Sequence, residues 1–357
     1  MQTSQILDDT KIIQDIDKSG MLSILEKFPE QIQDAIQITQ DAHLQDFIKI
    51  DNVIFTGMGA SGISGDIITG LYRDKIDTPI AVNRDYNLPK WVHKNTLAIV
   101  LSYSGNTDET ISAFKEAYQK KCHILAISSN GKLQELCEKR DVTFIQIPTG
   151  IQPRAATAYL LTPLLFILQK NGLLHHSIDT DLEETIQISK ACCKEYGSTT
   201  SVKDNLAKQI AGSLYETIPQ IYGWSFYNPV AQRWRTQINE NSKMIASFDV
   251  LPEANHNDIV GWAANPEISK HFSCVLIRDH HEESIYMKTR LDFMKSLFQD
   301  VSSNVLEIQP QGKSRLARAV SLMLLGDFVS CYLAVLRQVD PTPIAAIQEL
   351  KNQLASL

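Results

Sequence analysis

Hydrophobic positions along the first half of the chain follow two alternating periods. Short apolar runs rich in β-branched residues predict five strands, at residues 52–55, 80–82, 97–101, 123–127 and 143–147. Helical spacing follows the first strand at 63–71 and separates later strands at 107–118 and 132–139. Because strands and helices alternate, this half predicts an α/β domain with a parallel, doubly wound, flavodoxin-like sheet and helices on both faces.

A second alternating series follows a helical stretch at 179–214. Its strands are expected at 218–222, 244–248, 273–276 and 304–308, and its helices at 231–241, 283–298, 315–336 and 343–354. Two domains are also the default for 357 residues. We place an N-terminal domain with leading helices at 1–190 and a C-terminal domain at 191–357, which repeat one architecture.

The composition is that of a folded protein, with 43% hydrophobic and 21% charged residues. The net charge of −7 argues against a nucleic-acid-binding surface. It also means that an anionic substrate must be held by local donors and not by a general positive field.

The six cysteines have neither C-x-x-C spacing nor a paired pattern, which favours free thiols in a reducing cytoplasm. No His, Cys and Asp cluster has ligand-like spacing, so no metal is expected. The longest apolar stretch that we identify, around 159–168, falls short of the roughly 18–20 residues that cross a bilayer. The N-terminus has no apolar signal core, so we expect a cytoplasmic protein with no membrane partner.

The first candidate binding segment is 57–66, GMGASGISGD, which follows a predicted strand and opens a helix. Glycines let the backbone approach a ligand closely, and the free amides at a helix start favour an anion. The G-x-G-x-x-G spacing from Gly57 also matches a dinucleotide fingerprint. That fingerprint requires an acidic residue at the end of the next strand, where this sequence has Asn83, so a nicotinamide cofactor is disfavoured. A tight turn without a ligand is the simpler alternative.

The second candidate segment is 102–110, SYSGNTDET, again between a predicted strand and a helix. Helix capping explains the hydroxyl of Thr107 but not those of Ser102 and Ser104. Both segments leave the carboxyl ends of strands in one sheet, where doubly wound folds bind ligands. Two loops of hydroxyls and amides suit a small phosphomonoester. The chain here resembles the SIS sugar isomerase domain family, which includes regulators that bind sugar phosphates without turning them over.

A polar block at 228–243, NPVAQRWRTQINENSK, carries the first acid–base candidate. Helical spacing puts Val230, Trp234 and Ile238 on one face, a predicted core stripe, and puts Glu240 near the helix end. From the residues alone, Glu240 is equally an exposed cap or a catalytic base.

His256 lies in a second block, 251–262, LPEANHNDIVGW, between two Asn residues after a Pro turn. A loop position with hydrogen-bonding neighbours favours a functional histidine over a core one. Other charged groups are interpreted as structural. Contact of Arg233 and Arg235 with substrate is one alternative, but on a helix surface these residues are expected to pair with carboxylates. The segment 280–283, HHEE, is expected to form a solvated loop.

These blocks, with PRAATAY at 153–159, resemble the bifunctional phosphoglucose/phosphomannose isomerases, a family with two SIS domains. The likeness runs in order from about residue 50 to the C-terminal helix. It implies conversion of glucose 6-phosphate to fructose 6-phosphate through a cis-enediol, with action on mannose 6-phosphate as well. It also implies a homodimer whose active site lies near the interface. A non-catalytic sugar-phosphate-binding SIS protein is the alternative, because it would need only the two loops.

The same resemblance gives each candidate residue a role. Glu240 would be the base that moves a proton between C1 and C2, and Arg154 would stabilise the enediolate. His256, assisted by Lys351, would open the sugar ring. The phosphate would be bound by residues of the two loops: Gly59, Ala60, Ser61, Ser102, Ser104 and Thr107. Ala60 stands where the family usually has Gly, and neither a cofactor nor a metal is implied.

Overall fold

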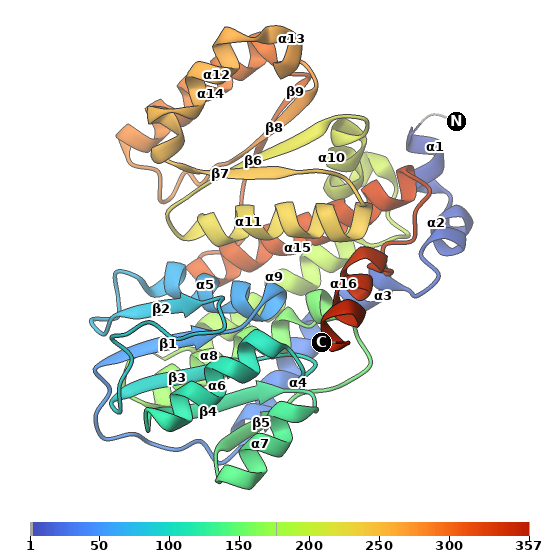
Figure 1. Ribbon diagram of the computed structural model, residues 1–357. Helices are drawn as coiled ribbons and strands as arrows, with labels where there is room; N and C mark the ends of the chain where they lie inside the picture. The colour runs from blue at the N-terminus through green and yellow to red at the C-terminus, as the bar shows by residue number, and fades with distance from the viewer. Residues whose placement is uncertain (1–2, 176, 357) are drawn as a thin grey trace. The chain divides into compact units, whose positions relative to one another are not determined.

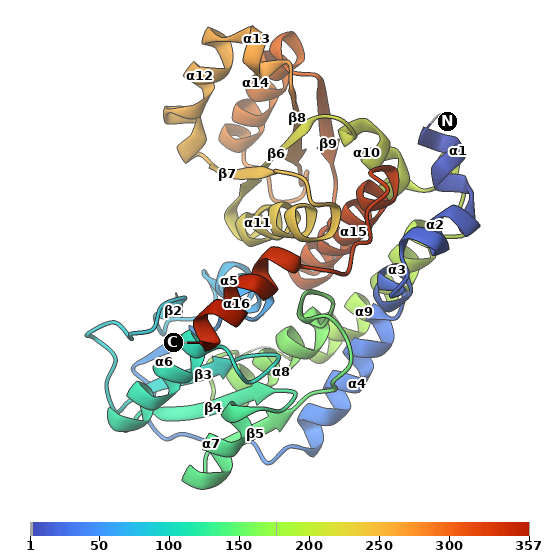
Figure 2. The ribbon, with the colours of Figure 1, turned by 45° about the vertical axis from the view of Figure 1, so that its right-hand side comes forward.

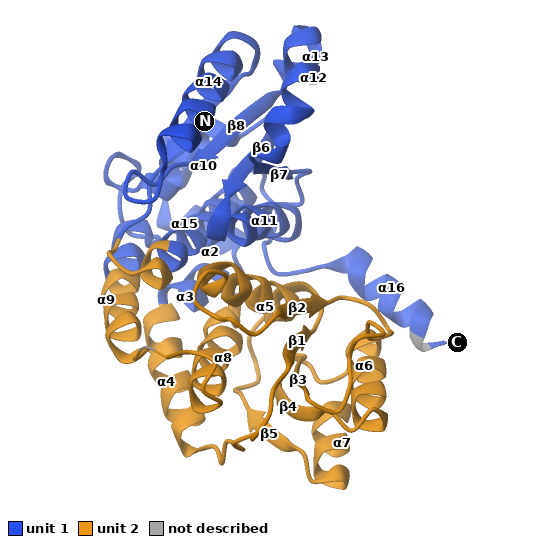
Figure 3. Cartoon of the chain, turned by 90° about the vertical axis from the view of Figure 1, so that its left-hand side faces the viewer, with its two compact units in different colours: residues 1–26, 191–311, 319–357 blue, residues 27–190, 312–318 orange. Residues whose placement is uncertain are grey.

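The computed structural model describes residues 3–175 and 177–356 (Figure 1). The chain forms two compact units (Figure 3). Unit 1 consists of Met1–Glu26, Ala191–Gln311 and Ala319–Leu357, and unit 2 consists of Lys27–Lys190 and Gly312–Arg318. Residues 1–26, assigned above to the N-terminal domain, thus group with C-terminal segments. One reason is that Asp8 accepts a hydrogen bond from the Val202 amide (2.7 Å) and Glu26 accepts one from the Ser198 amide (3.0 Å).

Unit 2 is built on a five-stranded parallel sheet in the order β2-β1-β3-β4-β5, as predicted. The strands are β1 (Asn52–Thr56), β2 (Ile80–Asn83), β3 (Thr96–Leu101), β4 (His123–Ser128) and β5 (Thr143–Gln146). The central strand β3 is buried at every position, as a continuous aliphatic run between two helix layers requires. Asn52 lies opposite Thr96 and Thr56 opposite Val100, so β1 and β3 end side by side.

Helices cover both faces of this sheet (Figure 3). On one face lie α4 (Phe28–Asp41), α5 (Gly59–Tyr72) and α8 (Thr157–Lys170), and on the other lie α6 (Asp108–Gln119) and α7 (Lys132–Arg140). Buried apolar side chains fill the space between the sheet and helices α6 and α7. They include Ile54, Val100, Phe114, Ala126 and Leu133.

Unit 1 has a four-stranded parallel sheet in the order β7-β6-β8-β9, which repeats the order of the first four strands of unit 2. The strands are β6 (Ile218–Trp224), β7 (Ser247–Leu251), β8 (Phe272–Ile277) and β9 (Asn304–Ile308). α11 (Asn228–Gln237) packs on β6 and β7, and α14 (Ile285–Val301) packs on β8 and β9. Figures 1 and 2 place these two helices on opposite faces of the sheet.

The remaining helices of the chain are mostly short. They are α1 (Thr3–Asp8), α2 (Thr10–Ile16), α3 (Met21–Glu26), α9 (Asp179–Tyr196), α10 (Leu206–Leu214), α12 (Asp258–Ala264), α13 (Pro266–Ser269), α15 (Arg315–Leu336) and α16 (Ala345–Ala355). Short 3-10 turns are η1 (Pro153–Ala155), η2 (Val202–Asp204), η3 (Ser225–Tyr227) and η5 (Glu253–His256).

One strand, β7, begins later than the predicted 244–248. The reason is the end of α11, which continues into a π-helical turn, η4 (Ile238–Ser242), before Lys243 adopts a left-handed conformation with φ of 55°. This wider turn uses residues that the apolar pattern had assigned to the strand. The predicted core stripe on α11 is confirmed, because Val230, Trp234 and Ile238 are fully buried.

The expectation that no uninterrupted apolar run reaches membrane-spanning length concerns one long apolar helix, α15, whose run is interrupted by Asp327. By length and composition this helix could cross a bilayer, but its whole apolar window is buried inside the protein. Its Asp327 is paired with Arg233 of α11. A helix that is apolar on all sides is also typical of a protein core, and burial favours that interpretation here.

Candidate active site

The glycine loop after β1 forms the start of α5. Gly59 has a φ of +52°, which residues with a side chain rarely adopt, and nothing lies within 4 Å of where its Cβ would be. Ala60 follows within the helix and therefore needs no positive φ. The Ser61 amide bonds to the carbonyl of Met58 (3.0 Å). The amides of Gly59 and Ala60, at the exposed helix start, are the donors that this geometry offers to an anion.

The hydroxyl loop follows β3 and leads into α6. Ser102 is buried, and its Oγ lies 3.1 Å from Oγ1 of Thr107. Thr107 occupies the N-cap position, as predicted, but its side chain makes no capping bond. Capping is therefore the wrong explanation for this hydroxyl, which pairs with Ser102 instead. Ser104 is half-buried, and its Oγ accepts from the Asn106 amide (3.3 Å).

The two loops meet at the carboxyl edge of the sheet in unit 2. The Tyr103 amide donates to Oγ of Ser61 over 3.4 Å, which joins the loop after β3 to the first turn of α5. The strand order reverses between β1 and β3, because β2 lies beyond β1 and β4 beyond β3. Open α/β sheets bind ligands outside the strand ends at such a switch point. The structure therefore brings the six predicted phosphate-binding residues to the expected place in the fold.

Gly105 allows the second loop to pack closely against the turn after β4. Its φ is +67°, and a Cβ there would lie 1.7 Å from the carbonyl oxygen of Asn130 and 2.8 Å from Oγ of Ser128. The turn after β4 therefore packs directly against this loop, and no larger residue fits. The hydroxyls of the loop are consequently held on a fixed turn.

Arg154 belongs to the same unit and is only 4% exposed. It lies on η1, which packs against α5 and α8. The hydroxyl of Tyr103 accepts from the Ile151 amide (3.2 Å), so the segment that leads to Arg154 is tied to the hydroxyl loop. A buried guanidinium interacts with an anion more strongly than an exposed one, because less water screens the charge.

Glu240 lies half-buried in the π-helical turn at the end of α11. Both neighbouring side chains are fixed: Asn239 donates to the Arg235 carbonyl (2.8 Å) and Asn241 donates to Oγ of Ser330 (2.8 Å). Single π turns occur frequently at functional sites. A carboxylate on such a turn is held at a defined place from which it could accept a proton.

His256 is exposed at the end of η5. The chain that follows it is anchored by Asp258, which accepts from the hydroxyl of Tyr222 and from Nε1 of Trp262 (2.9 Å). Burial raises the pKa of Tyr222, so its hydroxyl remains a donor at neutral pH. Lys351 is exposed on α16.

The predicted site residues divide between the two units. The phosphate-loop residues and Arg154 belong to unit 2, and Glu240, His256 and Lys351 belong to unit 1. Substitutions can therefore address the candidate anion-binding residues and the candidate acid–base residues in separate units.

Comparison with known proteins identifies related sequences and structures. The model of the bacterial phospho-glucose isomerase C-terminal SIS domain matches residues 203–354. A bifunctional phosphoglucose/phosphomannose isomerase of Caldicellulosiruptor bescii is 42% identical over 342 residues, which covers 94% of this chain and 99% of that protein. The chain belongs to the bifunctional phosphoglucose/phosphomannose isomerase family.

A further member of the family, from Aquifex aeolicus, is 35% identical over 87% of this chain and 92% of its own. Among solved structures, a glucose-6-phosphate isomerase like protein from Thermus thermophilus matches with a TM-score of 0.64. That match covers 97% of this chain and 98% of the other at 15% identity, so it shows a shared fold.

In this family member, Arg233 does not lie on the surface as predicted. It is 2% exposed, and its Nη2 lies 2.7 Å from Asp327, which also accepts from Gln237 (2.8 Å). Burial raises the pKa of Asp327, and the charge of Arg233 opposes that shift. The guanidinium of Arg235 lies over the ring of Phe248, 5.6 Å from its centroid. For Arg233, pairing with a carboxylate was therefore expected, but the burial of the pair was not.

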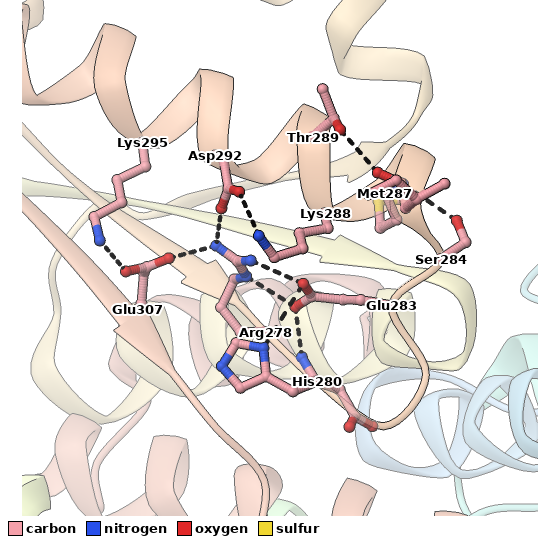
Figure 4. Close-up of polar contacts among 12 residues, drawn as sticks. Arg278, His280, Glu283, Ser284, Met287, Lys288, Thr289, Asp292, Lys295 and Glu307 are labelled. Carbon is pink, nitrogen blue, oxygen red and sulfur yellow. Dashed lines mark hydrogen bonds and ion pairs between the residues drawn. The ribbon is translucent and has the colours of Figure 1, made fainter.

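The prediction of a solvated loop at 280–283 is wrong for Glu283, whose side chain is 2% exposed. Glu283 accepts two hydrogen bonds of 2.8 Å from Arg278, which also contacts Asp292 (2.9 Å) and Glu307 (Figure 4). The hydrogen bonds from Arg278 to Glu283 raise the pKa of the Arg278 guanidinium. His280 remains exposed. The partners come from the loop before α14, from α14 itself and from β9, so no local pattern reveals the whole network.

Sequence reasoning missed Arg84, which lies directly after β2. Arg84 forms an ion pair with Asp66 of α5, and its Nε lies 2.9 Å from where a Cβ on Gly62 would be. One cation therefore packs beside the glycine loop. Its place after a strand, at the carboxyl edge of the sheet, was the signal that could have identified it.

Across the residues that the structure describes, no group of three or more His, Cys, Asp or Glu side chains could hold a metal ion. All six cysteines are free thiols. Burial raises the pKa of Cys122 to about 11 and that of Cys137 to about 12, so these thiols are poor nucleophiles near neutral pH.

Proposed function

We propose that this protein interconverts hexose 6-phosphates, glucose 6-phosphate with fructose 6-phosphate and mannose 6-phosphate with fructose 6-phosphate. The observation that carries the proposal is the likeness to a bifunctional phosphoglucose/phosphomannose isomerase over 94% of this chain and 99% of that relative. Both aldoses give the same enediol, because C2 becomes planar when it loses its proton. One active site can therefore serve both substrates.

The phosphate is assigned to the switch point of unit 2. Three groups support this assignment: the amides of Gly59 and Ala60 at the start of α5, the paired hydroxyls of Ser102 and Thr107, and the hydroxyls of Ser61 and Ser104. Hydrogen bonds from helix-start amides and hydroxyls to a charged phosphate are stronger than those to a neutral group.

The proton transfers are assigned to side chains of unit 1. His256, assisted by Lys351, moves the proton of the C1 hydroxyl to the ring oxygen, which opens the pyranose. Glu240 then takes the proton from C2 of the open-chain sugar. The C2 hydroxyl gives its proton to the negative C1 oxygen, Glu240 returns its proton to C1, and O2 becomes the carbonyl oxygen of the ketose.

We assign to Arg154 the stabilisation of the negative charge that develops on the enediolate oxygen. A guanidinium that is already buried and fixed needs little reorganisation when that charge appears. The proposal needs no metal and no nicotinamide, so turnover should persist in EDTA and a titration with NAD should show no binding.

Substitution of the proposed base tests the assignment. Glu240→Gln keeps the size and removes the basic oxygen, so kcat should fall by about 10²–10⁴-fold while glucose 6-phosphate still binds. Glu267→Gln is the matched control, because Glu267 is exposed and pairs only with Lys270 among the described ion pairs. Full turnover by Glu240→Gln would show that the base is misassigned. Binding of glucose 6-phosphate by wild-type protein without any conversion would favour the non-catalytic SIS protein.

We also propose a cytoplasmic homodimer that acts in glycolysis and gluconeogenesis, with the active site near the subunit interface. Exposed large apolar side chains on α14 and α16 support self-association, because monomers rarely leave such groups uncovered together. They are Ile285, Tyr286 and Phe293 on α14, and Ile347, Leu350 and Leu354 on α16. Light scattering at several concentrations, which should give twice the chain mass, tests the dimer. Whether His256 acts across it can be tested by mixing inactive His256→Ala and Glu240→Gln subunits.

A further inference from the structure

Lys243 is the residue at which the turn that carries Glu240 ends. It has φ of 55° and ψ of 34°, the left-handed conformation in which helices commonly end, usually at glycine. Its ammonium nitrogen lies within hydrogen-bond distance of four main-chain carbonyls, which share its three N–H groups. The carbonyls belong to Glu240 (2.9 Å), Asn241 (3.0 Å), Asp340 (2.8 Å) and Pro341 (2.8 Å).

Two of these carbonyls lie in the last turn before Lys243. Carbonyls at the end of a helix lack a partner within the helix, and a lysine side chain can satisfy them. Ordinary capping therefore accounts for the bonds to Glu240 and Asn241. It does not account for the bonds to Asp340 and Pro341, which lie far along the chain between α15 and α16.

The two further bonds tie the turn to a second segment of unit 1. That segment leads into α16, on which Lys351 lies, and it has its own turn, in which Asp340 accepts from the Thr342 amide (2.9 Å). One ammonium group thus joins the main chain of Glu240 to the segment that precedes Lys351. An ammonium group has donors and no acceptor, so in each of these contacts the lysine donates and the main-chain carbonyl accepts.

We propose that Lys243 is a positioning residue that sets the place of the Glu240 carboxylate through the main chain of its turn. The inference rests on the proposed function, in which Glu240 moves the proton. Lys243 touches no substrate in this account. Its removal would leave phosphate binding unchanged and would let the base move away from the alignment that proton transfer requires, because small displacements cost rate steeply.

Lys243→Met tests the inference, since methionine keeps most of the length and loses the ammonium. We expect kcat for glucose 6-phosphate to fall by about 10–100-fold with KM within about twofold of the wild-type value. Lys208→Met is the matched control. The Lys208 ammonium also donates to two main-chain carbonyls, of Ser198 (2.9 Å) and Thr200 (2.7 Å), but it holds no residue with a proposed role. That variant should lose thermal stability and keep the kcat of the folded enzyme.

Rescue by an added amine separates positioning from general destabilisation. Lys243→Gly removes the side chain and suits the left-handed backbone, and n-butylammonium can then supply the missing ammonium. We expect n-butylammonium to restore kcat of Lys243→Gly toward the wild-type value, and tetramethylammonium, which has no N–H donor, to restore nothing.

A wild-type protein without isomerase activity would overturn the proposed function itself. An active wild type with an inactive Glu240→Gln, but with Lys243→Met at full kcat, would overturn this inference alone. Equal loss of kcat in Lys208→Met, or equal rescue by both ammonium ions, would also overturn it.

Discussion

The two sheets of this protein end in loops of the same topology but opposite character. In unit 2, the strands at the switch point, β1 and β3, are followed by glycine, hydroxyl and amide groups, and the space beside Gly59 is open. In unit 1, the corresponding strands β6 and β8 are followed by side chains that bond to each other. Tyr227 donates to Asp279 (2.6 Å), and Arg278 and Glu283 form a buried ion pair.

The carboxylate of Glu283 takes a place that resembles that of an anion ligand. It accepts from the Asp279 amide (2.9 Å) and from the guanidinium of Arg278, just before Ser284 caps α14. The loop of unit 1 therefore holds a carboxylate from its own chain, whereas the loop of unit 2 is the one to which we assign the phosphate of the substrate. A repeated architecture thus need not repeat its binding site. The difference lies in whether the loop satisfies its own donors.

The largest expected effect comes from removing the internal cation of unit 1. Arg278→Met leaves Glu283 buried without its partner, which should lower the free energy of unfolding by about 3–5 kcal/mol. Urea denaturation measures this loss. Lys295→Met is the control, because its pair with Glu307 is exposed and should contribute at most about 1 kcal/mol. Equal, small losses in the two variants would mean that the loop of unit 1 is not held by its ion pair.

The next effect comes from weakening the open loop of unit 2. Ser102→Ala removes a hydroxyl that we assign to the phosphate, so KM for glucose 6-phosphate should rise by roughly 10–100-fold. Ser284→Ala is its counterpart in unit 1, where the hydroxyl accepts from the Met287 amide (3.2 Å). That variant should lose about 1 kcal/mol of stability and keep its KM. An equal rise of KM in the two variants would contradict the claim that only the loop of unit 2 binds the phosphate.

The smallest effect is a dependence of stability on pH. Burial disfavours the charged form of Glu283, but the hydrogen bonds from Arg278 and from the Asp279 amide outweigh it and hold the pKa below its ordinary value of 4.5. The folded protein therefore binds this proton less readily than the unfolded chain. The stabilisation is complete above pH 4.5 and is lost as the pH falls through the folded-state pKa.

Denaturation at several acidic pH values measures this dependence. Glu283→Gln cannot titrate, so its free energy of unfolding should fall less steeply below pH 4.5 than that of the wild type. Parallel curves for the two proteins would contradict the assignment of the acid dependence to Glu283.

The sequence predicted the fold and the open loop well because both depend on local patterns. Continuous apolar runs such as β3 and the glycine and hydroxyl residues at strand ends are visible without knowledge of any partner. The closed loop was missed because Arg278 is held from three places at once: Glu283 in its own loop, Asp292 on α14 and Glu307 on β9, 29 residues away. Arg233 was placed on the surface for the same reason, since its partner Asp327 is 94 residues away.

The π-helical turn at Glu240 could not be predicted from the sequence for a different reason. Residues 228–241 have an ordinary helical pattern, and nothing local indicates the π turn or the left-handed Lys243. The Lys243 ammonium also bonds to the carbonyls of Asp340 and Pro341, which only the folded chain brings to the lysine. The site residues that depend on distant partners are therefore the ones that only the structure could describe.

The most direct test of the central claim is a crystal structure of Glu240→Gln with glucose 6-phosphate bound. The account predicts phosphate density at the amides of Gly59 and Ala60 and at the hydroxyls of Ser102 and Thr107, with Arg278 and Glu283 still paired in unit 1. Phosphate bound at the loop of unit 1, with Ser102 and Thr107 untouched, would contradict it.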